Sequence, residues 1–124
     1  MLIFYFFKQF RSPEEYAYNL QTEAIDVFSM GNIFYYLLTD KEPYANLREE
    51  KSGDHIKEMI MNGTRPELTG DKILAHMDDP SATALIEAMN MCHVYDYQER
   101  ENSSTVRDFL VERMKEIKEK LLRN

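Results

Sequence analysis

The chain has 124 residues, of which 44% are hydrophobic and 30% charged, a composition typical of one globular domain. Its formal net charge of -7, from 22 acidic against 15 basic residues, gives no overall electrostatic attraction to nucleic acid or to an anionic membrane. The single cysteine, Cys92, excludes an internal disulfide, and His55, His76 and His93 lack metal-ligand spacing. We therefore expect an intracellular, cytoplasmic protein with no bound metal and no nucleic-acid partner.

The first residues, MLIFYFF, are apolar but lack the features of a signal peptide, because no positive region precedes them and no small-residue cleavage site follows. The most apolar internal run, residues 24–38, contains Asp26 and Asn32 and is shorter than the ~20 residues that span a bilayer. We expect no membrane span.

The stretch Ser12-Pro13-Glu14 has the composition of a helix start. Proline suits the first helical position, and acidic side chains are favourable at a helix N-terminus. A local turn followed by a helix would explain these residues without any further role.

Residues 24–38 form the most apolar stretch of the interior, with apolar side chains on nearly every helical face. Such a helix is normally covered on all sides, so we expect it to be the central, buried helix of the domain. A buried carboxylate must be hydrogen-bonded, and Asp26 near the helix start is expected to accept bonds from backbone N–H groups. Gly31 costs about 1 kcal/mol relative to alanine inside a helix, which indicates close approach by another backbone.

Three further helices are predicted after a turn at residues 39–44 and a polar loop that runs through Gly53. The first has Asp54 as its cap and ends before Gly63 and Pro66, and the second starts at Asp79-Pro80. The last has Ser103, Ser104 or Thr105 as its cap and an apolar stripe made of Val106, Phe109, Leu110, Met114, Ile117 and Leu121. No strand or repeat is evident, so the predicted fold class is mainly α.

Three segments follow one another along the chain: SPEEY, DVFSMGNIFYYLLTDKEPY and MCHVYDYQERENS. In this order they resemble the A-P-E, D-V-W-S-x-G-x-x-x-x-E-L-x-T-G-x-x-P-F and C-W-x-x-D-P-x-x-R-P-S motifs of eukaryotic protein kinases. The intervening NGTRPEL is similar to N-G-x-R-P. Together these segments make a specific pattern over residues 10–118.

The resemblance implies the helical C-lobe of a kinase-like fold, from the end of the activation segment onward, with a central helix surrounded by about four others. The central helix would be the F helix of the family and the three later ones its G, H and I helices. This divides the chain into a poorly matched apolar segment at 1–9, a partial kinase domain at 10–120 and a tail at 121–124.

The resemblance also assigns structural roles to single residues. Glu14 matches the glutamate of A-P-E and Arg100 the arginine of R-P-S, which pair in the family across what is here a separation of 86 positions. Asp26 matches the aspartate that accepts backbone N–H bonds from the catalytic loop. The complete structural signature is Ser12, Pro13, Glu14, Asp26, Gly31 and Arg100.

Several positions depart from the family pattern. Ser12 replaces alanine and Phe28 replaces tryptophan, His93 replaces the tryptophan that follows Cys92, and the prolines around Arg100 are replaced by Tyr97 and Glu101. These departures leave open whether a parent enzyme would prefer Ser/Thr or Tyr hydroxyls.

Phosphoryl transfer in this family needs a Gly-rich loop, a phosphate-binding lysine, an H-R-D aspartate and a D-F-G aspartate, and the sequence contains none of them. We therefore expect no catalytic, cofactor-binding or metal-binding residue in this chain, whereas a full-length parent would use ATP and magnesium.

Two functions fit these observations. The chain is a fragment of a protein kinase whose parent phosphorylates protein hydroxyls, or it is a stand-alone C-lobe that acts as a non-catalytic protein-binding module. The module would use the G-helix region and the loop from Tyr44 to Gly53 to bind a protein partner or substrate. In either case MLIFYFF would be available to cover apolar surface on the central helix.

Overall fold

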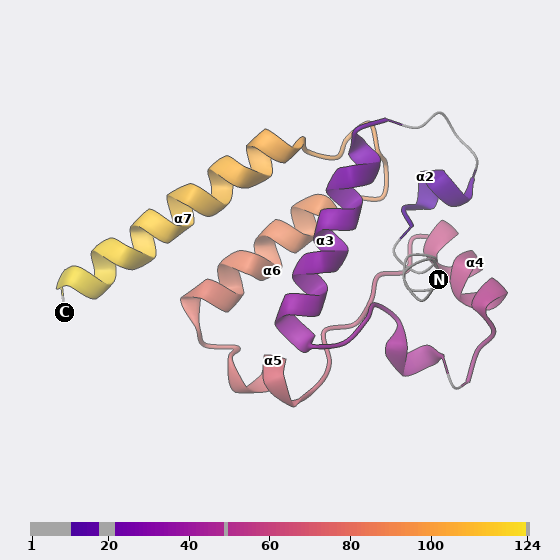
Figure 1. The fold of residues 1–124 in the computed structure, drawn as a ribbon, viewed down its shortest axis with the longest axis horizontal. Coiled ribbons are helices and arrows are strands. Elements are labelled where there is room, and N and C mark those ends of the chain that lie inside the picture. Colours follow the sequence, from indigo (N-terminus) through magenta and orange to yellow (C-terminus); the bar gives the residue numbers. More distant parts are fainter. Residues whose placement is uncertain (1–10, 18–21, 49, 124) are drawn as a thin grey trace, which may run out of the picture.

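The structure is a computed structural model that describes residues 11–17, 22–48 and 50–123, and every regular element in these ranges is helical (Figure 1). The prediction of a mainly α fold is therefore confirmed. The apolar segment 1–9 and its proposed covering role lie outside the described residues. The elements are α2 (Pro13–Tyr16), α3 (Ala24–Thr39), the 3-10 helix η1 (Ala45–Leu47), α4 (Gly53–Met61), α5 (Asp71–Ala75), α6 (Pro80–Cys92) and α7 (Ser103–Arg123).

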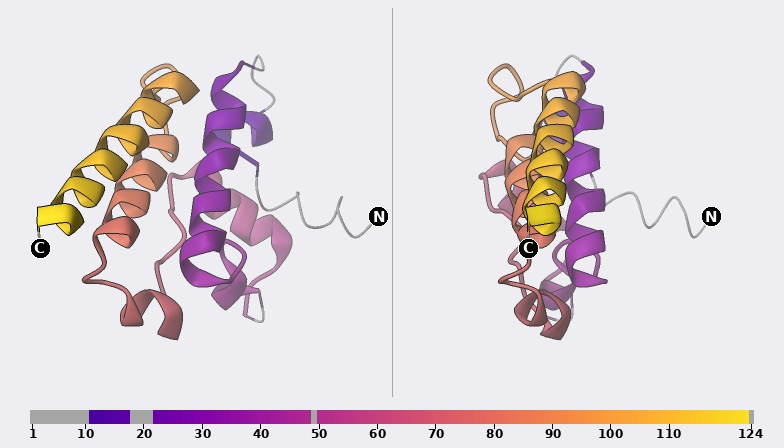
Figure 2. Two further views of the ribbon diagram at one scale, coloured as in Figure 1. Left: turned by 60° about the vertical axis from the view of Figure 1, so that its left-hand side comes forward. Right: turned by 90° about the vertical axis from the view of Figure 1, so that its left-hand side faces the viewer.

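Helices α3, α6 and α7 lie side by side, with α6 in the middle (Figures 1 and 2). Helix α2 packs against α4 on the other side of α3, and α5 contacts α3 near its C-terminal end. None of the helices in the described ranges is both long enough and apolar enough to cross a membrane.

The core consists of three clusters of buried side chains. The first joins α3, α6 and α7, the second joins α3, α5 and α6, and the third joins the segment after α3 to α4. Their buried members are Val27, Ala88, Cys92 and Val106; Tyr35, Leu38, Ile73 and Met89; and Tyr44, Ile56 and Ile60.

The prediction that α3 is covered on all sides is wrong. Ile33, Tyr36 and Leu37 are 57%, 44% and 53% exposed, and they share one side of the helix with the exposed Asp26. In the right-hand view of Figure 2, α3 forms an outer edge of the helical layer, and its free side is not covered by any described element. Apolar composition identified the helix correctly, but composition does not determine how many neighbouring elements are present to cover it.

Two predicted caps are also wrong by one to three residues. Helix α4 is capped by Ser52, whose Oγ accepts the His55 N–H at 3.2 Å, so Asp54 falls inside the first turn. Helix α7 is preceded by Asn102, whose Oδ1 accepts the Thr105 N–H at 2.8 Å. In both cases the better cap is the residue that is still extended or outside the helix, because only there does the side-chain oxygen reach the N–H three residues on.

The second predicted helix start is confirmed, since Asp79 Oδ1 accepts the Ser81 N–H at 2.9 Å and Pro80 is the first helical residue. Helix α5 was not predicted, because five residues carry too little periodicity to be recognised. Helix α7 continues through Arg123, so residues 121–123 are helical.

Candidate functional site

A buried ion pair joins the first and last kinase-like segments. Arg100 Nη1 donates to Glu14 Oε1 at 2.6 Å, and Arg100 Nη2 donates to Glu14 Oε2 at 3.0 Å. The side chains are 0% and 2% exposed, respectively. Two parallel N–H···O bonds between a guanidinium and a carboxylate form a bidentate contact that fixes both position and orientation. The structure therefore brings together two residues that are 86 positions apart.

All five N–H groups of the Arg100 guanidinium have an acceptor. Besides the two bonds to Glu14, Nε donates to the Val94 carbonyl at 2.9 Å, Nη1 to the Ala24 carbonyl at 2.7 Å and Nη2 to the Tyr95 carbonyl at 3.3 Å. A buried charge is tolerated only when it is paired and its remaining donors are satisfied. Arg100 thus connects α2, the start of α3 and the loop between α6 and α7.

Local interactions at α2 hold Glu14 in place. Ser12 is fully buried, and its backbone N–H and hydroxyl both donate to Glu15 Oε1, at 3.0 and 3.1 Å. Pro13 occupies the first helical position, where its missing N–H would have no intrahelical partner in any case. The predicted helix start is confirmed, and it directs Glu14 towards the interior.

The loop before α7 holds Arg100 in a similar way. The Arg100 backbone N–H donates to the Asp96 carbonyl at 3.0 Å, and the Asp96 carboxylate accepts the Gln98 N–H at 2.9 Å. The Tyr95 hydroxyl donates to the Met61 carbonyl at 2.5 Å, which ties the same loop to the end of α4. Hydrogen bonds within the loop and to the end of α4 therefore hold Arg100 in position.

The aromatic ring of Phe28 lies against the guanidinium. The Arg100 Cζ lies 4.9 Å from the centroid of the Phe28 ring, and that ring lies 4.8 Å from the ring of His93. A guanidinium over an aromatic face is attracted by the quadrupole of the ring. Phe28 thus links Arg100 to the interior of α3.

His93 is buried against α3 rather than exposed. Its Nε2 lies 2.8 Å from Asn32 Oδ1, and 2% of the residue is exposed. Burial, reinforced by the positive charges of Arg65 and Arg100, lowers the pKa of His93 to about 3. The imidazole is therefore neutral at physiological pH and donates its Nε2 proton to the Asn32 amide oxygen.

Gly31 makes this packing possible. A Cβ at Gly31 would lie 2.6 Å from His93 Cδ2 and 2.7 Å from Cys92 Cβ, both far inside contact distance. The prediction of a close approach at Gly31 is therefore correct, but the neighbours are side chains and not a second backbone. Cys92 is 0% exposed, and burial raises the pKa of its thiol to about 11, so it behaves as a small apolar side chain, as predicted.

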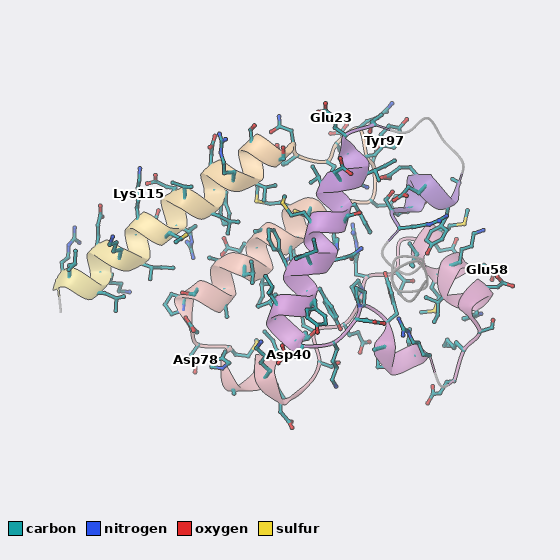
Figure 3. All side chains as sticks on the ribbon, in the orientation of Figure 1. Glu23, Asp40, Glu58, Asp78, Tyr97 and Lys115 are labelled. Carbon is teal, nitrogen blue, oxygen red and sulfur yellow. The ribbon has the colours of Figure 1, made fainter. Side chains whose placement is uncertain are left out.

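The expectation for Asp26 is wrong. Asp26 is exposed, and within the described residues its carboxylate accepts no backbone N–H bond. It lines a pocket of about 500 Å³ between the starts of α3 and α7, together with Glu23, which is labelled in Figure 3, and Glu101. Asp26 lies on the free face of α3, and this explains why the sequence argument from burial did not apply.

The pocket does not suit a nucleotide. Its lining includes the acidic residues Glu23, Asp26 and Glu101, while Arg100, which also lines it, is neutralised by Glu14. A triphosphate would meet net negative charge there. In the part of the chain that the structure describes, no cluster of three or more His, Cys, Asp or Glu side chains is arranged to hold a metal ion.

Sequence reasoning missed the Asn32–His93 contact. Asn32 is an amide in an apolar helix, and His93 follows the buried Cys92, so each is a polar side chain at a position where burial is expected. Two such residues in separate helices are a signal for a buried hydrogen bond, because unpaired polar groups in a core are costly.

These features define the class of protein as a helical domain in which a buried Arg–Glu pair joins two segments far apart in the sequence. Part of the chain is similar to a serine/threonine kinase: "Leucine-rich repeat serine/threonine-protein kinase 1" of Caenorhabditis elegans is 36% identical over 66 residues. The match covers 53% of this chain and 2% of that protein, so the chain corresponds to a very small part of its length. No family model matches the chain.

Proposed function

We propose that the chain is the later, helical part of a protein kinase domain, from the end of the activation segment to the last helix. The activity of the parent would be transfer of the γ-phosphoryl group of ATP to protein hydroxyls. In this proposal α3 corresponds to the F helix, and α4, α6 and α7 correspond to the G, H and I helices.

The observation that carries the proposal is the bidentate Glu14–Arg100 pair. Glu14 and Arg100 lie in two motifs, far apart in the chain, that both resemble the kinase family. In the structure these two residues form a buried, fully hydrogen-bonded pair. The contact between the charged residues of the two motifs supports a common origin for them. The 36% identity to a serine/threonine kinase over 66 residues supports the same origin.

The 124 residues alone would be catalytically inert under this proposal. The sequence has no Gly-rich loop, no H-R-D and no D-F-G, and these carry the phosphate, hydroxyl and magnesium contacts of the reaction. Glu14 and Arg100 would support the activation segment of a complete domain mechanically and would not contact the reacting atoms.

The proposal is tested first by reading the genomic sequence in frame upstream of Met1. Finding H-R-D and D-F-G there, at kinase spacing, is the expected result. The chain extended by that segment should then transfer labelled phosphate from ATP to protein hydroxyls, whereas the 124 residues alone should not. Calorimetry with magnesium-ATP should give no binding heat for the 124 residues, and a dissociation constant of about 1 mM or lower would overturn the inert assignment.

A stand-alone, non-catalytic binding module is the alternative, and one observation favours it. The described residues satisfy all five Arg100 donors without any further lobe, so the buried pair needs no partner from outside them. Helix α4, with His55 and Glu58 exposed, would then bind the protein partner. A stop codon in frame directly before Met1 would favour this alternative over the fragment.

A further inference from the structure

The distal half of α7 carries an apolar surface that no described element covers. Val111, Met114 and Leu121 are 46%, 67% and 71% exposed, whereas Val106 in the first turns of the same helix is fully buried against α3 and α6. In Figure 1 the distal end of α7 extends past the start of α6, and in Figure 2 it forms an outer edge of the layer. The predicted apolar stripe is therefore buried near the start of α7 and exposed in its distal half.

A groove of about 590 Å³ lies along this part of the helix. Ser81 at the start of α6 forms one side, and α7 provides the rest through Val111, Met114, Ile117 and Leu121, with Lys115 and Lys118 at the rim. Figure 3 labels Lys115 midway along the helix. The floor of the groove is thus apolar, and its charged rim is entirely basic.

Lysines accompany the apolar side chains on the groove side of distal α7. Val111, Lys115, Lys118 and Leu122 follow the spacing of three to four residues that places side chains on one side of a helix. The three glutamates of this half repeat with the same spacing on the other side, at positions 112, 116 and 119. The groove face therefore presents apolar side chains and lysines, although the whole chain has a net charge of -7.

We propose that this groove binds an acidic amphipathic helix of a protein partner. An amphipathic helix fits an apolar groove with side chains at positions i, i+3, i+4 and i+7, and Asp or Glu beside that stripe would pair with Lys115 and Lys118. The face from Val111 to Leu122 is about 17 Å long, so about three helical turns of the partner would fill it.

A second copy of this chain is a poorer occupant, because symmetric pairing through this face would place lysines against lysines. An anionic membrane is also poorer, because the net charge of -7 and the glutamates on the other side of α7 oppose it. The inference concerns α7 and does not depend on the kinase origin proposed above.

The test uses the full chain and a fluorescent, designed helical peptide of about 15 residues, with leucines at helical spacing flanked by glutamates. Fluorescence anisotropy at low salt should give a Kd below about 100 µM, and binding should weaken as salt rises. The same peptide with lysines in place of the glutamates should bind at least about tenfold more weakly. Equal affinity for the two peptides would overturn the proposed charge recognition.

Matched variants distinguish binding in this groove from non-specific binding to other exposed apolar residues. Leu121→Asp should raise the Kd at least about tenfold, whereas Leu74→Asp, at a leucine that is 70% exposed on α5, should change it less than about twofold. Lys118→Glu should weaken binding at least about threefold, and Lys120→Glu, on the opposite side of α7, should have little effect. Both leucines are exposed, so the variants should keep the wild-type circular dichroism and Tm, which are measured alongside.

The other occupants are outcomes of the same series. Light scattering should show a monomer, and sedimentation with phosphatidylserine-phosphatidylcholine vesicles should show no binding. A dimer, or vesicle binding, that Leu121→Asp abolishes while the acidic peptide fails to bind would overturn the proposal. Equal peptide affinity for Leu121→Asp and Leu74→Asp would overturn it as well.

Discussion

Replacing Arg100 with methionine removes the buried cation and keeps a side chain that fills much of the same space. The Glu14 carboxylate would lose both guanidinium donors, and the carbonyls of Ala24, Val94 and Tyr95 would each lose one. Breaking one side of a buried ion pair typically costs about 3–5 kcal/mol. Because domains of this size have a total stability of about 5–15 kcal/mol, the variant should lose a large fraction of it.

The loss is measured by thermal unfolding followed by circular dichroism. An unfolding entropy of about 2.1 cal/mol/K per residue converts 3–5 kcal/mol into a drop in Tm of about 12–19 °C for 124 residues. Arg107→Met is the matched control, because the Arg107–Asp108 pair is 70% exposed on both sides. An exposed pair is worth about 0–1 kcal/mol, so the control should shift Tm by no more than about 4 °C.

Equal shifts for the two methionine variants would refute the inference that the buried pair stabilises the fold. If Arg100→Met does not fold, Glu14→Gln gives a second measurement, since it keeps every other bond of Arg100 and should cost less. The double variant Glu14→Leu, Arg100→Met should be more stable than the sum of its single variants implies, because neither partner is then left as an unpaired buried charge.

Two further predictions concern the packing of α6 against α3. The unfolded chain protonates His93 near pH 6.5 but the folded chain only near pH 3, so the unfolded state binds more protons between these values and stability falls on acidification, by about 2 kcal/mol at pH 5. Urea unfolding at pH 7 and 5 should show that His93→Gln removes this loss and that His76→Gln, at an exposed position, retains it; equal pH dependence in both variants would contradict the assignment. Gly31→Ala should destabilise by about 1–3 kcal/mol, since the clash with His93 and Cys92 outweighs the better helix propensity. Gly53→Ala, where a Cβ meets open space, is its control in thermal unfolding, and a similar Tm in the two alanine variants would argue against the tight contact.

Local chemistry allowed several elements to be predicted from the sequence. Asp79-Pro80 starts α6 as expected, because cap and proline act within one turn and need no tertiary partner. The start of α4 was misplaced because Ser52 and Asp54 are both good caps, and only the extended backbone at Ser52 decides between them. Local sequence rules thus predict that a helix is present more reliably than they predict the residue at which it begins.

Burial was harder to predict because it depends on which elements lie alongside. Met114 and Leu121 continue the apolar stripe of α7 that begins at the buried Val106, yet both are largely exposed since α7 extends beyond α6. Likewise, the sequence places apolar residues on nearly every face of α3, but Ile33 and Leu37 lie on a side that the described helices leave open. A periodic pattern shows which face of a helix is apolar, but it does not show which element packs against that face.

The Glu14–Arg100 pair could be predicted only from the resemblance to kinases, and its geometry explains why. Helix α2 has four residues, too few for a helix to be stable by itself, so its position depends on tertiary contacts. Its capping interactions orient Glu14, but they contain no information about a partner 86 residues away. The three carbonyl bonds of Arg100 fix the other end by holding the loop before α7 against the start of α3. Each end is therefore built locally, and the packing of α3 against α6 and of α2 against α4 brings the two ends together, so the pair should break when that packing is lost.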